Sequence, residues 1–114
     1  MQIYYLEIVA HDIDEVCSSF EKLHGVEFSD PVAELGNART APLSGGGKIG
    51  VRAPMGDMEK PVVRPYILVD DIHTAVKEVV NNGGEIAHPP LELPGQGTFA
   101  IYIQGGVQHG LWQL

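Results

Sequence analysis

The sequence predicts an α+β fold in which two βαβββ repeats form an open, cup-shaped mixed β-sheet, with one helix per repeat on the outside. Three observations lead to this prediction: the length, an internal similarity, and one amphipathic helical segment in each half. The chain has 114 residues, a usual size for a single domain with its own hydrophobic core. Apolar residues make up 44% and charged residues 19%, as expected for a folded globular chain.

The two halves of the chain resemble each other when the sequence is shifted by 59 positions. Nine residues are identical at this shift, among them Asp12 with Asp71 and Gly25 with Gly84. Many of the repeated residues are those that begin a helix, end a helix or form a turn, so the similarity concerns structure. We predict one domain over residues 1–114, with repeat one at 1–52, a linker at 53–61 and repeat two at 62–114.

In the first repeat, residues 3–10 are rich in β-branched and aromatic side chains and predict a strand. Asp12 is placed to cap a helix, and Gly25 fits the left-handed residue that ends it. Between them the apolar residues recur at helical spacing: Ile13, Val16, Cys17 and Phe20. We expect Cys17 to be a small buried hydrophobic residue. Three extended segments are predicted to follow, at 26–30, 33–42 and 48–52.

The second repeat follows the same plan. Residues 62–69 predict a strand, Asp71 the helix cap, and Gly83-Gly84 the helix end. The apolar stripe of this helix is Ile72, Ala75, Val76 and Val79. Extended segments are predicted at 85–91, 98–104 and 110–114. One helix covers only one face of each sheet, so we expect the other faces to border a cleft, where ligand sites tend to lie.

Charge and cysteine content restrict the partners and the compartment. The formal net charge of −8 argues against nucleic acid and anionic membranes as partners, because both favour a positive surface. No segment approaches the roughly 20 apolar residues that span a bilayer, and the N-terminal residues lack the pattern of a signal peptide. A single cysteine allows no internal disulfide. We therefore predict a cytoplasmic location.

Four short motifs in the second half carry a family resemblance: Val69-Asp70-Asp71, Gly83-Gly84, Pro94-Gly95-Gln96-Gly97 and Gly110-Leu111-Trp112-Gln113. Together with the repeated βαβββ order they resemble the short glyoxalase-like members of the vicinal oxygen chelate superfamily. This superfamily includes glyoxalase I, bleomycin-resistance proteins and extradiol dioxygenases. The resemblance implies the fold but not the reaction, because the superfamily contains isomerases, dioxygenases, thiol transferases and simple binding proteins.

The same resemblance implies where a metal would be bound. Metal-dependent members carry His, Glu or Gln ligands on the first and last strands of each half, and these positions correspond here to Tyr5, Gly50, Arg64 and Gly110. None of the four is a good ligand for zinc, nickel or manganese, and an arginine repels a cation. We therefore predict no metal and no other cofactor. A divalent metal could still be bound if the register of the last strand slipped by one residue, because His109 would then point inward beside Glu7.

Strand alternation predicts which side chains line the cup. With Tyr5 pointing inward, Tyr4, Leu6 and Ile8 should pack on the helix side. The predicted ligand-binding residues are Tyr5, Glu7, Arg52, Arg64, Tyr66, Tyr102, His109 and Trp112, with Phe99 as the alternative to Tyr102.

Several roles stay open for these residues. Arg64 either forks onto a carboxylate or phosphate of a ligand or pairs with Glu7. Glu7 is also the one tentative catalytic residue, as a proton shuttle. Trp112 is a ligand contact, a core residue or a dimer contact.

Three functions are compatible with this reading. The favoured one is a metal-free protein that binds a small organic, aromatic or anionic molecule. The second is a metal-dependent lyase, isomerase or dioxygenase that uses Glu7, His109 and a ligand from a dimer mate. The third is a homodimer or regulatory partner complex in which the cup is vestigial. The sequence leaves open whether the protein is an enzyme.

Overall fold

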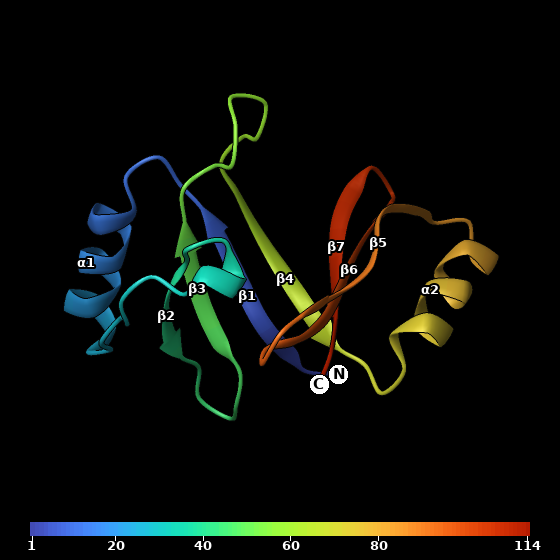
Figure 1. Cartoon of the computed structure of the whole chain (residues 1–114), viewed down its shortest axis with the longest axis horizontal. Coiled ribbons are helices and arrows are strands. Elements are labelled where there is room, and N and C mark those ends of the chain that lie inside the picture. The colour runs from blue at the N-terminus through green and yellow to red at the C-terminus, as the bar shows by residue number, and fades with distance from the viewer. The chain divides into compact units, whose positions relative to one another are not determined.

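The computed structural model describes residues 1–114, which form two compact units (Figure 1). The first unit comprises residues 5–63. The second comprises residues 64–114 together with residues 1–4. Each unit contains one helix and its own hydrogen-bonded strands, so the α+β class and the one-helix-per-half arrangement are confirmed.

The first unit contains a three-stranded array with the order β2-β3-β1. Its strands are β1 (Ile3–Val9, shared with the second unit), β2 (Arg39–Pro42) and β3 (Lys48–Arg52). Strand β1 runs parallel to β3, with Glu7 opposite Gly50, and β2 runs antiparallel to β3. Helix α1 (Ile13–His24) contacts β3.

The local sequence explains where α1 begins and ends. The Asp12 carboxylate accepts a hydrogen bond from the Glu15 backbone N–H at 3.0 Å, and Gly25 ends the helix in the left-handed conformation at φ 67°. The predicted apolar stripe lies in the core of this unit, where Leu6 and Ile8 of β1 also pack. The buried residues of that core are Cys17, Phe28, Ala41, Ile49 and Val51.

The strand predicted at Val26–Asp30 is wrong. This segment is irregular and lies beside β2, where the Ser29 N–H donates to the Thr40 carbonyl at 2.8 Å. Pro31, which has no N–H, follows it and interrupts any continuous ladder. The chain then forms a short 3-10 helix (Ala33–Leu35), so β2 begins at Arg39 and not at residue 33.

The second unit contains β4 (Val62–Leu68, shared with the first unit), α2 (Ile72–Asn81), β5 (Glu85–Leu93), β6 (Gly97–Gln104) and β7 (Val107–Gln113). The strand order is β4-β7-β6-β5, with β4 and β7 parallel and the other pairs antiparallel. The chain start adds a hydrogen bond, from the Leu68 N–H to the Gln2 carbonyl at 2.9 Å.

Helix α2 contacts β5, β6 and β7 and buries the predicted stripe. Asp71 caps it by accepting from the His73 and Thr74 N–H groups at 3.0 and 3.1 Å. The Gln113 side chain adds a bond from the Ile72 N–H at 2.7 Å, which gives the terminal Gly-Leu-Trp-Gln motif a structural role. Gly83, at φ 86°, follows the helix end, as predicted.

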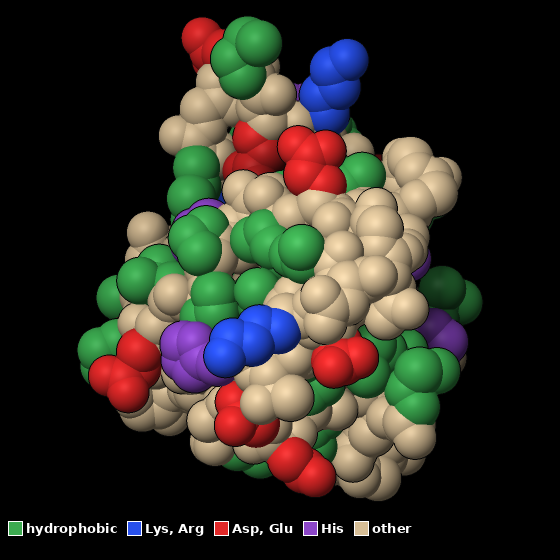
Figure 2. Space-filling model, turned by 90° about the vertical axis from the view of Figure 1, so that its right-hand side faces the viewer, with side chains coloured by type: hydrophobic (Ala, Val, Ile, Leu, Met, Phe, Trp, Pro, Cys, Tyr) green, Lys and Arg blue, Asp and Glu red, His purple; other side chains and the backbone are tan.

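The outer surface near α2 is chemically mixed. Figure 2 shows acidic, basic and histidine side chains distributed among hydrophobic ones on the side where Figure 1 draws α2. His73, Lys77 and Glu78 of this helix are exposed, as expected for the polar face of an amphipathic helix. Neither helix has the length and apolar character needed to cross a membrane.

Candidate functional site

The face of the first unit that points away from α1 carries three of the predicted site residues. Leu6 and Ile8 contact the α1 core, so alternation along β1 directs Tyr5 and Glu7 to the other face. Arg52 at the end of β3 reaches Glu7 on this face. All three are buried, at 3%, 7% and 5% exposure for Tyr5, Glu7 and Arg52.

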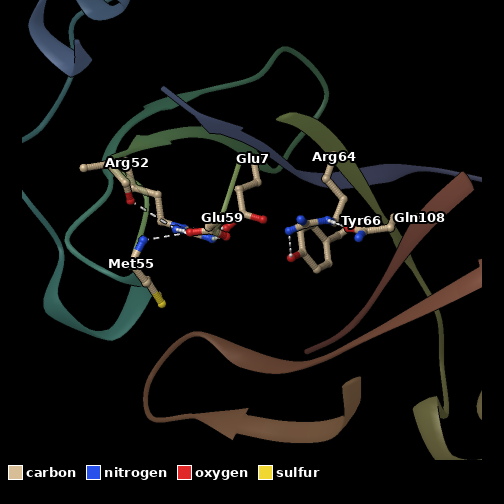
Figure 3. A network of polar contacts seen from close by, with 8 residues as sticks. Glu7, Arg52, Met55, Glu59, Arg64, Tyr66 and Gln108 are labelled. Carbon is tan, nitrogen blue, oxygen red and sulfur yellow. Dashed lines mark hydrogen bonds and ion pairs between the residues drawn. The ribbon is translucent and has the colours of Figure 1, made fainter. Parts of the chain in front are cut away.

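Arg52 lies between two carboxylates (Figure 3). Its Nε donates to Glu7 at 2.8 Å, and its two terminal nitrogens donate to the two Glu59 oxygens at 2.7 and 2.8 Å. The hydrogen bonds that Arg52 donates to Glu59, followed by the charge of Glu7 and the hydrogen bond donated to it, raise the Arg52 pKa well above its ordinary value against the opposing effect of burial. This arginine is therefore a permanently charged structural cross-link.

Glu59 is a member of this network that the sequence did not indicate. It lies in the predicted linker 53–61, and it also accepts the Met55 backbone N–H at 2.8 Å. The network thus ties the linker to the ends of β1 and β3. The sequence did not indicate the bond between Arg52 and Glu7.

A second polar group lies in the second unit, on β4 and β7 (Figure 3). Arg64, which is 6% exposed, donates from Nε to the Gln108 side-chain oxygen at 3.1 Å and from a terminal nitrogen to the Tyr66 hydroxyl at 3.4 Å. Gln108 is the residue of β7 that reaches Arg64. The sequence reading had considered only its neighbour His109.

An aromatic cluster lies beside this arginine within the second unit. The Tyr66 ring meets Trp112 and Phe99 edge-on, with centroids 5.6 and 6.1 Å apart. His88 of β5 lies 4.8 Å from Phe99. Trp112 is buried and its indole N–H donates to the Gln96 carbonyl at 3.2 Å. The face therefore combines one guanidinium with several rings.

Tyr102 and His109 lie on the opposite face of this sheet. They are cross-strand partners on β6 and β7, and their rings stack at 4.8 Å with an interplanar angle of 14°. Tyr102 packs against the α2 core. Of the two alternatives left open by the sequence, Phe99 is thus the ring that shares a face with Tyr66 and Trp112.

Tyr4 corrects one further expectation. It was placed on the helix side, but its ring lies 5.8 Å from Trp112, within the second unit. Tyr4 belongs to the second unit, whereas the β1 residues from Tyr5 onwards belong to the first.

The residues present do not fit a divalent metal. The four implied ligand positions are a tyrosine, an arginine and two glycines, and no three His, Cys, Asp or Glu side chains gather anywhere in the chain. In addition, a Cβ placed at Gly50 would collide with Tyr5, and one at Gly110 with Tyr66. The four positions thus offer one hydroxyl oxygen as a donor atom, and the two glycines have no space for a ligand side chain.

One surface hollow, of about 480 Å³, lies in the first unit beside β2 and the segment 27–29. None of the predicted site residues lines it.

The fold is similar to that of several solved structures of low sequence identity. A hypothetical protein from Bacillus halodurans superposes with a TM-score of 0.79 at 15% identity, covering 99% of this chain and 94% of that one.

Methylmalonyl-CoA epimerase from Mycobacterium tuberculosis gives a TM-score of 0.75 at 14% identity, over 97% of this chain and 86% of that one. The Streptomyces coelicolor epimerase in complex with 2-nitronate-propionyl-CoA gives 0.73 at 16% identity, over 99% and 94%. At sequence identities this low, the similarity to these structures is a similarity of fold alone. No protein-family model matches the sequence, and no curated protein matches it significantly.

Proposed function

We propose that this protein binds a small organic anion with a flat apolar part, and that it does so without a divalent metal. The observation that carries the proposal is the Arg64 guanidinium on the same sheet face as Tyr66, Phe99 and Trp112. A few placed polar groups among aromatic side chains are the usual composition of a ligand site.

The two buried arginines support different roles. Arg52 is bonded to two carboxylates and ties the linker to the sheet. Arg64 donates to the Gln108 side-chain oxygen and to the Tyr66 hydroxyl, and these two contacts orient its planar guanidinium. A guanidinium fork matches a carboxylate or phosphate with two parallel hydrogen bonds, so Arg64 supplies the anion-binding group.

The rings beside Arg64 define the rest of the ligand. Tyr66 meets Phe99 and Trp112 edge-on, while Phe99 and Trp112 stack on each other with an interplanar angle of 29°. Such rings accept a further flat group by stacking or edge contact. His88 extends the row of rings towards β5. An aromatic carboxylate or aryl phosphate combines the two features that this face recognises.

Calorimetric titration tests the proposal with benzoate, phenyl phosphate and the uncharged analogue benzamide, on protein treated with chelator. We expect at least one anion to bind and benzamide to bind at least about tenfold more weakly, since a charge-assisted bidentate contact is lost. Arg64→Gln should weaken anion binding by a similar factor. The matched control is Arg39→Gln, because Arg39 is a partly exposed arginine paired with Asp14 in the first unit.

If the two substitutions weaken anion binding equally, Arg64 does not belong to the proposed site. If none of the three compounds binds, the proposal is wrong. Circular dichroism of each variant separates loss of binding from loss of fold.

The structural neighbours favour a second candidate, an isomerase acting on a CoA thioester, because two of them are methylmalonyl-CoA epimerases. Epimerisation at the carbon next to a carbonyl needs a positioned base. Glu7, the candidate catalytic residue, accepts a hydrogen bond from Arg52. This bond favours a structural role for Glu7 over a role as the base.

Exchange of the α-hydrogen of methylmalonyl-CoA in deuterated water, followed by mass spectrometry with and without added Co²⁺, tests this candidate. Exchange that disappears in Glu7→Gln would establish the isomerase reading over simple binding. Exchange no faster than in buffer would exclude it.

A further inference from the structure

Each unit contains a contact between a strand glycine and a tyrosine ring, although the register of the two contacts differs. In the first unit, a Cβ built on Gly50 of β3 would collide with the hydroxyl and ring of Tyr5 on β1. In the second unit, a Cβ on Gly110 of β7 would collide with the ring of Tyr66, which lies directly opposite on β4. Each contact joins the two strands of a parallel pair.

Backbone conformation does not require these two glycines. Neither lies in the left-handed region, unlike Gly25, Gly36 and the turn glycines. Both are strand residues with regular ladder partners. A glycine inside a strand weakens it, unless another group must approach the backbone closely. The close group here is the tyrosine ring, so the absence of a side chain at Gly50 and Gly110 is a matter of space.

We propose that in each half a tyrosine ring fills the volume from which a side chain on the last strand would reach a metal: Tyr5 occupies this space at position 50, and Tyr66 occupies it at position 110. This inference rests on the metal-free part of the proposed function and supplies its physical cause. Metal binding is then prevented by the packing of side chains in two strand pairs, and not only by the absence of donor atoms.

The proposal makes the glycine and the tyrosine of each pair interdependent. A side chain at position 50 is excluded only while the Tyr5 ring is present, because the three nearest atoms to a Cβ there all belong to Tyr5. A substitution at Gly110 would not test the tyrosine contact alone, because the Pro65 backbone carbonyl oxygen also lies 2.8 Å from a Cβ at this position. The Tyr5–Gly50 pair is therefore the one to test.

The test is a double-mutant cycle on the full chain, measured by thermal unfolding. Gly50→Ala in the wild-type background should lower Tm by about 5 to 10 °C, as expected for overpacking a buried site in a domain of this size. In a Tyr5→Ala background the same change should shift Tm by less than about 2 °C. Gly56→Ala is the control, because nothing lies within 4 Å of a Cβ there and its φ is not left-handed.

Metal uptake supplies a second measurement that does not depend on how stable the variants are. After dialysis against Mn²⁺, Co²⁺, Ni²⁺ or Zn²⁺ and gel filtration, elemental analysis of the wild type should find far less than one equivalent of metal per chain.

Equal Tm shifts for Gly50→Ala in both backgrounds would overturn the packing inference, even if the protein binds no metal. Stoichiometric metal in the wild type would overturn it as well. Anion binding is independent of the cycle: failure of both benzoate and phenyl phosphate to bind would contradict the proposed function while leaving the coupling between Tyr5 and Gly50 intact.

Discussion

Replacing Arg52 with methionine should be among the most destabilising single substitutions in the first unit. The change removes the cation from between Glu7 and Glu59 while keeping a long apolar stem. The Arg52 side chain is 6% exposed, and it donates to Glu7, to both oxygens of Glu59 and to the Ala53 carbonyl. All four hydrogen bonds are lost, and the Glu7 carboxylate stays buried at 7% exposure.

The magnitude follows from that burial. Removing one partner of a buried ion pair costs about 3–5 kcal/mol, because an uncompensated charge is left in a poorly solvated site. A domain of this size has a free energy of unfolding of roughly 5–15 kcal/mol, so the loss is a large fraction of the total. Glu59→Gln should cost only about 1–2 kcal/mol, because the Glu59 side chain is 26% exposed and solvent screens its charge.

Urea unfolding at pH 7, followed by far-UV circular dichroism, measures these values. An arginine is charged at pH 7 even at its ordinary pKa, so the assay compares variants with and without this positive charge. The decisive variant is Arg52→Met combined with Glu7→Met. Replacing both charges with apolar groups of similar size should recover most of the stability lost by Arg52→Met alone. The reasoning is refuted if Arg52→Met costs less than about 1 kcal/mol, or if the double substitution is no more stable than Arg52→Met.

Three further predictions concern single residues. Hydrogen bonds from the Thr74 and His73 N–H groups lower the Asp71 pKa in the folded protein. The stabilisation by this carboxylate is therefore complete at pH values above the ordinary aspartate pKa, and it is lost as the pH falls through the lowered pKa of the folded state. The difference in unfolding free energy between wild type and Asp71→Asn, measured by urea unfolding, should shrink between about pH 5 and pH 2. Gly25→Ala should destabilise by about 1 kcal/mol because its φ of 67° is left-handed, whereas Gly56→Ala should change stability by less than about 0.5 kcal/mol; equal effects would contradict the conformational argument. Burial raises the Cys17 pKa, so native protein should react with a thiol reagent far more slowly than urea-unfolded protein, and equally fast labelling would show that the α1 core is open.

The pairing of side chains within the candidate site illustrates what local sequence patterns do not contain. Glu59 reaches Arg52 because the linker folds back on the end of β3, and Gln108 reaches Arg64 because β7 pairs with β4 without a register slip. Strand alternation shows which residues of one strand share a face. It does not show which side chains of neighbouring strands meet, since this depends on register.

The sequence by itself determined the two helices and their ends, because these depend on local chemistry. Asp12 and Asp71 accept N–H groups close to them in the chain, and the apolar stripes recur every three or four residues. Tertiary structure alone decided that Phe99, not Tyr102, joins Tyr66 and Trp112, and that tyrosine rings fill the space above Gly50 and Gly110. Such contacts join residues far apart in the chain, and their geometry is set only when the strands have paired.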